Sequence, residues 1–156
     1  MSAKAVPDGF NTVSAYLVVP DANKAMDFYE KAFGAKRGAV MNGPDGGVMH
    51  AEMQIGNSTV MLTQENPAWE QKSAATYGGS PVSMHMYVDD ADALFNQAVE
   101  AGCSVTFPMS DVFWGDRYGK VTDVFGLSWG IATHKEDLSE EEMGKRAAEY
   151  FANMQG

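Results

Sequence analysis

Two histidines and one glutamate are the residues of this sequence best suited to metal or acid–base chemistry. His50 and Glu52 stand two positions apart in an alternating segment. On a strand they would share one face, about 7 Å apart. His85 lies in a second alternating segment, and two imidazoles with one carboxylate form a donor set typical of zinc or iron sites. Alternatively, the histidines hydrogen-bond neighbouring groups and Glu52 is solvated or paired with Arg117. His134, beside charged residues at a strand end, is expected at the surface.

The run Phe-Trp-Gly-Asp-Arg-Tyr-Gly adds a second group of candidates. Arg117 could bind a carboxylate or phosphonate through paired hydrogen bonds, and Trp114 or Tyr118 could stack on a planar ligand. Alternatively, Arg117 pairs with Asp116 or Asp123 to anchor a loop, and Trp114 fills the core. Neighbouring side chains on a strand point to opposite faces, so only alternate members of the run can share one pocket.

These candidates lie on elements that the sequence repeats. Residues 13–35 and 82–103 both begin Val-Ser, alternate with period two, and then reach Val-x-Asp-Ala. Asp21 and Asp90, 69 positions apart, are predicted N-caps of the helices that follow, and a glycine is placed to end each helix. Three further strands are expected in each half, the last two joined by a Gly-Asn turn in one half and an Asp-Val-Phe-Gly turn in the other.

The predicted fold class is therefore α+β, with two tandem β-α-β-β-β modules forming a curved mixed sheet around a cavity, plus a C-terminal helix. A single domain is expected over 1–156, with module one at about 11–64, a connector at 65–80, module two at about 81–134 and the last helix at about 139–154.

The last predicted helix has a capping box and one apolar stripe. Ser139 is followed three residues later by Glu142, the pattern of a helix start. The stripe needs a surface to pack on, either on this subunit or on a partner, and we expect a homodimer. Its residues are Met143, Ala147, Phe151 and Met154.

Alternation also assigns the two faces of each predicted strand. One face is apolar, as in Val13, Ala15 and Leu17, and is expected beneath the helices. The opposite face would expose rings on adjacent strands, which suits a binding surface, although a half-open sheet facing solvent is the alternative. The predicted ligand-binding residues are Tyr16, His50, Glu52, His85, Tyr87, Trp114, Arg117 and Tyr118.

Composition excludes several classes of function. The 156 residues carry a net charge of −10, and the lysines and arginines are scattered, so nucleic acids and anionic membranes are poor partners. No apolar run approaches the ~20 residues needed to cross a bilayer, and the N-terminus has no apolar signal core. The single cysteine, Cys103, fits a reducing cytoplasm and is expected to be a small buried hydrophobe.

The repeated module resembles the vicinal-oxygen-chelate superfamily, which includes glyoxalase I, bleomycin-resistance proteins and extradiol dioxygenases, and within it the PhnB-like branch. The similarity runs over roughly residues 11–134. The segments that carry it are Tyr16–Ala35, Val48–Glu52, Gly79–His85, Phe113–Gly119 and Phe125–Trp129.

The resemblance also locates the positions of a metal site. Many relatives bind a divalent metal through one His or Gln near the start of each module and one Glu or Gln on its last strand. Counted back from Val-x-Asp, the first-strand positions fall near Ser14 and Ser83, and the last-strand positions near Met61 and Gly130. These residues cannot hold a hard cation, so the resemblance implies that the usual ligand set is missing.

Two functions follow from these observations. The favoured one is a small-molecule-binding protein of the bleomycin-resistance kind, whose acidic groove would suit a cationic ligand. The alternative is a metal-dependent lyase, isomerase or dioxygenase acting on a small oxygenated metabolite, with His50, Glu52 and His85 as the metal candidates. A divalent metal is thus not the favoured cofactor.

Overall fold

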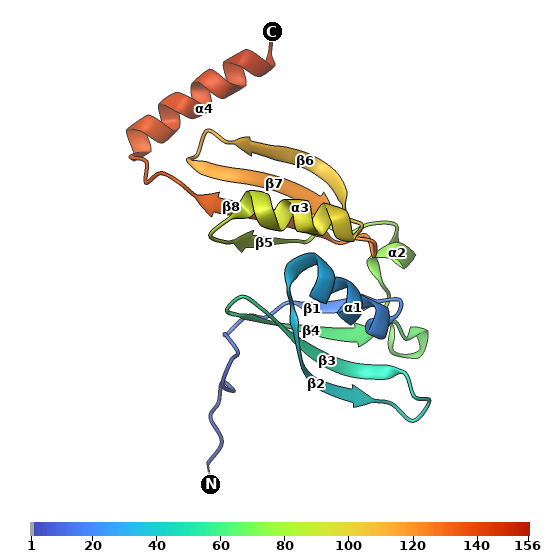
Figure 1. The fold of residues 1–156 in the computed structure, drawn as a ribbon. Helices are drawn as coiled ribbons and strands as arrows, with labels where there is room; N and C mark the ends of the chain where they lie inside the picture. The colour runs from blue at the N-terminus through green and yellow to red at the C-terminus, as the bar shows by residue number, and fades with distance from the viewer. Residues whose placement is uncertain (1) are drawn as a thin grey trace.

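The computed structural model describes residues 2–156 and contains the two predicted modules in tandem (Figure 1). Module one consists of β1 (Tyr16–Val19), α1 (Ala22–Phe33), β2 (Lys36–Asn42), β3 (Val48–Ile55) and β4 (Ser58–Gln64). Module two consists of β5 (Ser83–Tyr87), α3 (Ala91–Ala101), β6 (Ser104–Asp111), β7 (Asp116–Thr122) and β8 (Ser128–His134). The connector holds η1 (Pro67–Trp69) and α2 (Ala74–Tyr77), and α4 (Glu140–Met154) follows module two.

Each module forms its own mixed sheet with the same topology. The strand orders are β1-β4-β3-β2 and β5-β8-β7-β6. In each sheet the first strand pairs with the last in parallel, and the other pairs are antiparallel. The edge strands β1 and β5 face each other in the middle of the molecule (Figure 1). The predicted α+β class and the repeated β-α-β-β-β order are confirmed.

The helices begin and end where the sequence predicted. The Asp21 carboxylate accepts from the backbone N–H of Lys24 at 3.1 Å, and the Asp90 carboxylate accepts from that of Ala93 at 2.9 Å. Helix α1 ends at Gly34, whose φ of 65° lies in the left-handed region that glycine tolerates best.

Helices α1 and α3 pack on each other and lie on the same side of the two sheets (Figure 1). The apolar side of each strand faces them, so that Leu17, Ala51 and Met53 are buried, as alternation predicted. Val13 is an exception, because β1 begins only at Tyr16 and the Val13 side chain is 85% exposed. The opposite side of each sheet, called the uncovered face below, has no helix among residues 2–156 packed on it.

A buried carboxylate joins the two modules. Asp123 accepts hydrogen bonds from the Tyr29 hydroxyl of α1 at 2.7 Å and from the Trp129 indole of β8 at 2.8 Å. The ring of Phe33 packs on Trp129 with centroids 4.7 Å apart. Cys103 is buried as predicted, and burial followed by the charge of Asp123 raises its pKa to about 12. Its thiol is therefore protonated at neutral pH.

Helix α4 projects away from the sheets (Figure 1). Ser139 caps it by accepting from the backbone N–H of Glu142 at 3.1 Å, as the capping box predicted. Rings of Tyr150 and Phe151 contact Phe113 of module two, yet no α4 side chain is buried, and Phe151 stays 55% exposed. Within residues 2–156, no helix has both the length and the apolar character required to traverse a bilayer.

Candidate functional site

On module one, three of the predicted ligand-binding residues come together on the uncovered face. The Tyr16 ring stacks on His50, with centroids 5.8 Å apart and planes 22° apart. The Tyr16 hydroxyl lies 3.4 Å from His50 Nδ1, and Glu52 Oε1 lies 3.3 Å from His50 Nε2. Alternation along β3 places His50 and Glu52 on this side, since Ala51 and Met53 between and after them are buried under α1.

On module two, the predicted aromatic residues form a larger cluster around Tyr118. The Tyr118 ring stacks on His85 with centroids 5.7 Å apart and planes 22° apart. The Phe107 and Trp114 rings each lie 5.7 Å from Tyr118, centroid to centroid. Tyr87 completes the group by packing against His85 at 4.9 Å. The apolar contacts raise the pKa of the Tyr118 hydroxyl through burial, so this group remains a neutral donor.

The two groups occupy equivalent positions of the repeated module. Tyr16 pairs with Met61 across β1 and β4, and Met61 pairs with Glu52 of β3. In module two the corresponding row is His85, Gly130 and Lys120. Both modules therefore place a stacked ring pair at the same positions, but the two residue types are exchanged. Module one has tyrosine on its first strand and histidine on its third, whereas module two has histidine on its first strand and tyrosine on its third.

The first-strand residues directly opposite Met61 and Gly130 are thus Tyr16 and His85, rather than Ser14 and Ser83, which lie further back along the chain.

Asp116 fixes one end of the module-two cluster. It is 2% exposed and accepts from the Tyr87 hydroxyl at 2.9 Å and the Trp114 indole at 3.0 Å, with His134 Nδ1 at 2.8 Å. Burial raises the pKa of Asp116, but the hydrogen bonds from His134, Tyr87 and Trp114 together outweigh it, and the pKa is lowered. Hydrogen bonds with Asp137 and Asp116 raise the pKa of His134. His134 is exposed as predicted, but it also orients this buried carboxylate.

Arg117 does not lie with the other candidates. Its guanidinium contacts Asp92 of α3 at 2.9 Å and Asp111 at 3.5 Å, on the helix side of the sheet. The predicted pairs with Asp116, Asp123 or Glu52 are not formed. The reason is the pleat, since Arg117 alternates with Asp116 and Tyr118, which point to the uncovered face. Arg117 and Tyr118 therefore lie on opposite sides of the sheet. The prediction that both bind one ligand is wrong.

Lys120 is the residue of the uncovered face that the sequence reasoning missed. It follows Tyr118 by two positions, and its neighbours Gly119 and Val121 face α3. Alternation therefore places the Lys120 side chain on the uncovered face. The same rule of alternation, applied one step beyond Tyr118, predicts this position for Lys120.

The residues at the superfamily's metal positions do not fit a divalent cation. Ser14, Ser83, Met61 and Gly130 offer no carboxylate or imidazole, and Tyr16 and His85, which the register places opposite Met61 and Gly130, add only one imidazole. A Cβ at Gly130 would lie 2.6 Å from His85 Nδ1, so the His85 ring occupies the space where a ligating side chain would begin. Within residues 2–156, no three His, Cys, Asp or Glu side chains are grouped as a metal site would require, and His50, Glu52 and His85 do not form one.

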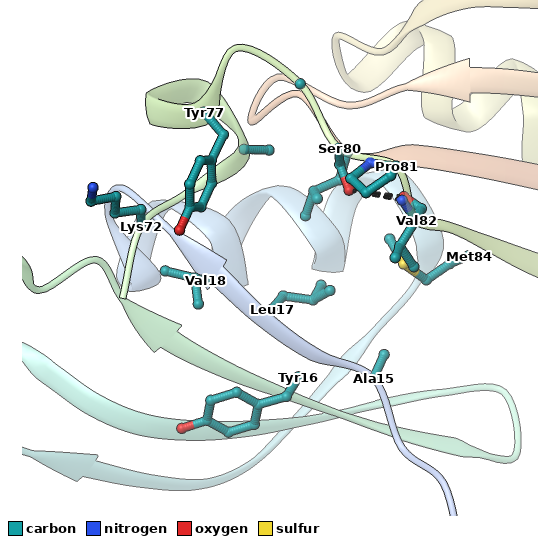
Figure 2. A pocket seen from close by; sticks show the side chains of 13 residues that line it. Ala15, Tyr16, Leu17, Val18, Lys72, Tyr77, Ser80, Pro81, Val82 and Met84 are labelled. Carbon is teal, nitrogen blue, oxygen red and sulfur yellow. Dashed lines mark hydrogen bonds between the residues drawn. The ribbon is translucent and has the colours of Figure 1, made fainter. Parts of the chain in front are cut away.

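Two cavities lie along the facing edges of β1 and β5. One, of about 650 Å³, runs between β1 and the connector (Figure 2), where Leu17 and Val18 face Tyr77 and Val82. Tyr16 extends from the other side of β1 in this view. The second, of about 700 Å³, lies between the β3–β4 turn and β5 and is lined by both His85 and Tyr87. Neither cavity is lined by His50 or Glu52.

The family model described as "Glyoxalase/Bleomycin resistance protein/Dioxygenase superfamily" matches residues 9–131. The chain belongs to this superfamily. A relative in Mycobacterium tuberculosis, the uncharacterized protein Rv0887c, is 40% identical over 134 residues, which cover 84% of this chain and 79% of that protein.

Two solved structures share the fold of this chain. The At5g48480 gene product of Arabidopsis thaliana superposes with a TM-score of 0.63 at 27% identity, covering 81% of this chain and 99% of that one. FosX from Listeria monocytogenes, a fosfomycin resistance protein solved with Mn(II), has a TM-score of 0.61 at 14% identity, covering 88% of this chain and 97% of FosX. At that identity the likeness shows the fold alone.

Proposed function

We propose that this superfamily member is a small-molecule-binding protein of the PhnB-like branch that holds its ligand on the uncovered face without the usual metal. The observation that carries the proposal is the pair of equivalent ring stacks, Tyr16 on His50 and His85 on Tyr118. Large rings left open to solvent on one sheet face are typical of binding surfaces. Tyr87, 62% exposed beside His85, extends this surface.

Charge supports a small-molecule partner over a nucleic acid or a membrane. Each of the three arginines is engaged by carboxylates, Arg37 by Asp27 and Glu30, and Arg117 and Arg146 by others. The lysines are scattered along the sequence rather than clustered, which disfavours a surface that follows a phosphate backbone. The single thiol, buried at Cys103, is consistent with a cytoplasmic protein.

The proposal includes a homodimer. Helix α4 exposes Phe151 and Met154, at 55% and 65%, on a helix that projects from the body of the chain. Covering this face with a second copy would remove both side chains from water, which favours association. Light scattering at micromolar concentration should give twice the chain mass, and Phe151→Glu should reduce it to one chain. A single-chain mass for the wild type would contradict the dimer.

The binding function is tested by two measurements on the same preparation. Elemental analysis of protein purified without chelator separates it from the metal-dependent lyase, isomerase or dioxygenase. Near-stoichiometric zinc, iron, nickel or manganese would contradict the proposal. Amide chemical-shift mapping with a set of planar compounds should then shift residues of β5, β7 and β8. His85→Ala should weaken such binding, whereas Lys36→Met, on the exposed strand β2, should not.

A further inference from the structure

We propose that Lys120 is the anion-binding residue of the uncovered face, and that the ligand is a small aromatic carboxylate. This inference rests on the proposed binding function and specifies the class of compound. The carboxylate would pair with the Lys120 ammonium, and the ring would pack among His85, Tyr118 and Phe107.

Burial distinguishes Lys120 from the other lysines. Of the eight lysines in the chain, Lys120 alone is half-buried, and the rest are exposed. Among the ion pairs of residues 2–156, none includes Lys120. The Lys120 stem is therefore held against the face while no carboxylate neutralises its ammonium, which leaves the charge free to pair with a ligand. A bound anion would neutralise that charge.

Register places the ammonium beside the rings. Lys120 pairs with Gly130, which pairs with His85 on the next strand. Because Gly130 has no side chain, nothing from β8 separates Lys120 from the His85 row. Tyr118, two positions before Lys120 on the same face, carries three ring contacts, with His85, Phe107 and Trp114. One positive charge next to the exposed rings of His85 and Phe107 matches a planar ring that bears one negative charge.

The net negative charge of the protein does not cancel the preference of this face for an anionic ligand. The net charge of −10 acts over distance and is screened within about 8 Å at physiological salt. Asp116, the carboxylate on the same face of β7, is about 13 Å away along the strand. Its lone pairs are already used by Tyr87, Trp114 and His134. The ligand charge is therefore set locally by Lys120, which replaces the expectation of a cationic ligand.

Three probes that share the naphthalene ring system and differ in charge test the inference: 2-naphthoate, 2-naphthalenemethanol and 2-naphthylmethylammonium. Their dissociation constants are measured by amide-shift titration on the full chain. The wild type should bind naphthoate most tightly. Lys120→Met keeps the aliphatic stem and should weaken naphthoate by about tenfold or more, the loss expected for a charge-assisted hydrogen bond. Naphthalenemethanol should bind both proteins equally, and Lys120→Arg should retain most of the naphthoate affinity.

Lys135→Met is the matched control, because Lys135 is exposed and its loss changes the net charge by the same amount. If Lys135→Met weakens naphthoate as much as Lys120→Met does, or if the wild type prefers the ammonium probe, the inference is overturned. Should the alcohol bind the uncovered face while Lys120→Met changes nothing, the binding function stands and only the assignment of the anion fails. Should none of the probes shift residues of that face, both fail.

Discussion

Removal of the Asp123 carboxylate is expected to be among the most destabilising single changes in this chain. Asp123 is 5% exposed and accepts from Tyr29, Trp129 and the backbone N–H groups of Phe125 and Leu127, at 2.7 to 3.0 Å. Tyr29 and Trp129 are 1% and 2% exposed, so neither donor can turn to water. The change Asp123→Ala leaves both unsatisfied.

The size of the effect follows from these two donors. Each buried unsatisfied donor costs about 1–3 kcal/mol, which gives roughly 2–6 kcal/mol for the pair. We therefore expect Asp123→Ala to lower the free energy of unfolding by about 4 kcal/mol. At about 2–4 °C per kcal/mol for a chain of this size, Tm should fall by roughly 8–16 °C.

Urea denaturation followed by far-UV circular dichroism measures this difference, and Tyr29→Phe provides the internal test. In the wild type, Tyr29→Phe removes one hydrogen bond to a carboxylate and should cost about 1.5–3 kcal/mol. In the Asp123→Ala background the same change removes an unsatisfied hydroxyl, so it should be neutral or stabilising. An equal cost of Tyr29→Phe in both backgrounds would refute the role assigned to the Tyr29–Asp123 hydrogen bond.

Two further predictions concern module two. Gly130→Ala places a Cβ 2.6 Å from His85 Nδ1, so it should displace that ring and lower stability by about 1–3 kcal/mol, measured by urea denaturation; an unchanged free energy of unfolding would contradict the close packing. Contacts with Asp137 and Asp116 raise the pKa of His134, so they stabilise the fold fully below the unfolded pKa of about 6.5 and cease to do so as pH rises through the folded pKa. The stability difference between wild type and His134→Gln should therefore shrink from pH 5.5 to pH 9, and a pH-independent difference would contradict it.

The module architecture could be predicted from the sequence because its signals are local. Period-two alternation, the Asp21 and Asp90 caps and the glycine helix ends each depend on residues within a few positions of one another. Because the same pattern occurs twice, 69 positions apart, the order of elements in one half also predicted that of the other. Alternation failed only at Val13, where the chain has not yet entered β1.

The candidate site was harder to predict from the sequence, because it depends on contacts between elements that are distant along the chain. Sequence spacing could not show that Asp92 of α3 engages Arg117, or that His134 reaches back to Asp116. Nor could it show that the connector folds into the short helix α2. The grouping of His85, Tyr87 and Tyr118 was predictable in part, because each sits on the polar side of an alternating strand.

The two modules differ in side-chain chemistry on the uncovered face but not beneath the helices. Positions beneath the helices keep apolar side chains in both modules, such as Leu62 of β4 and Ile131 of β8. Any polar residue there would lose its water without gaining a partner, so packing limits the choice. On the uncovered face the equivalent row instead changes chemistry, with Glu52 in module one and Lys120 in module two. Packing places no such limit on a face open to solvent, so the fold itself allows opposite charges at this position of the two modules.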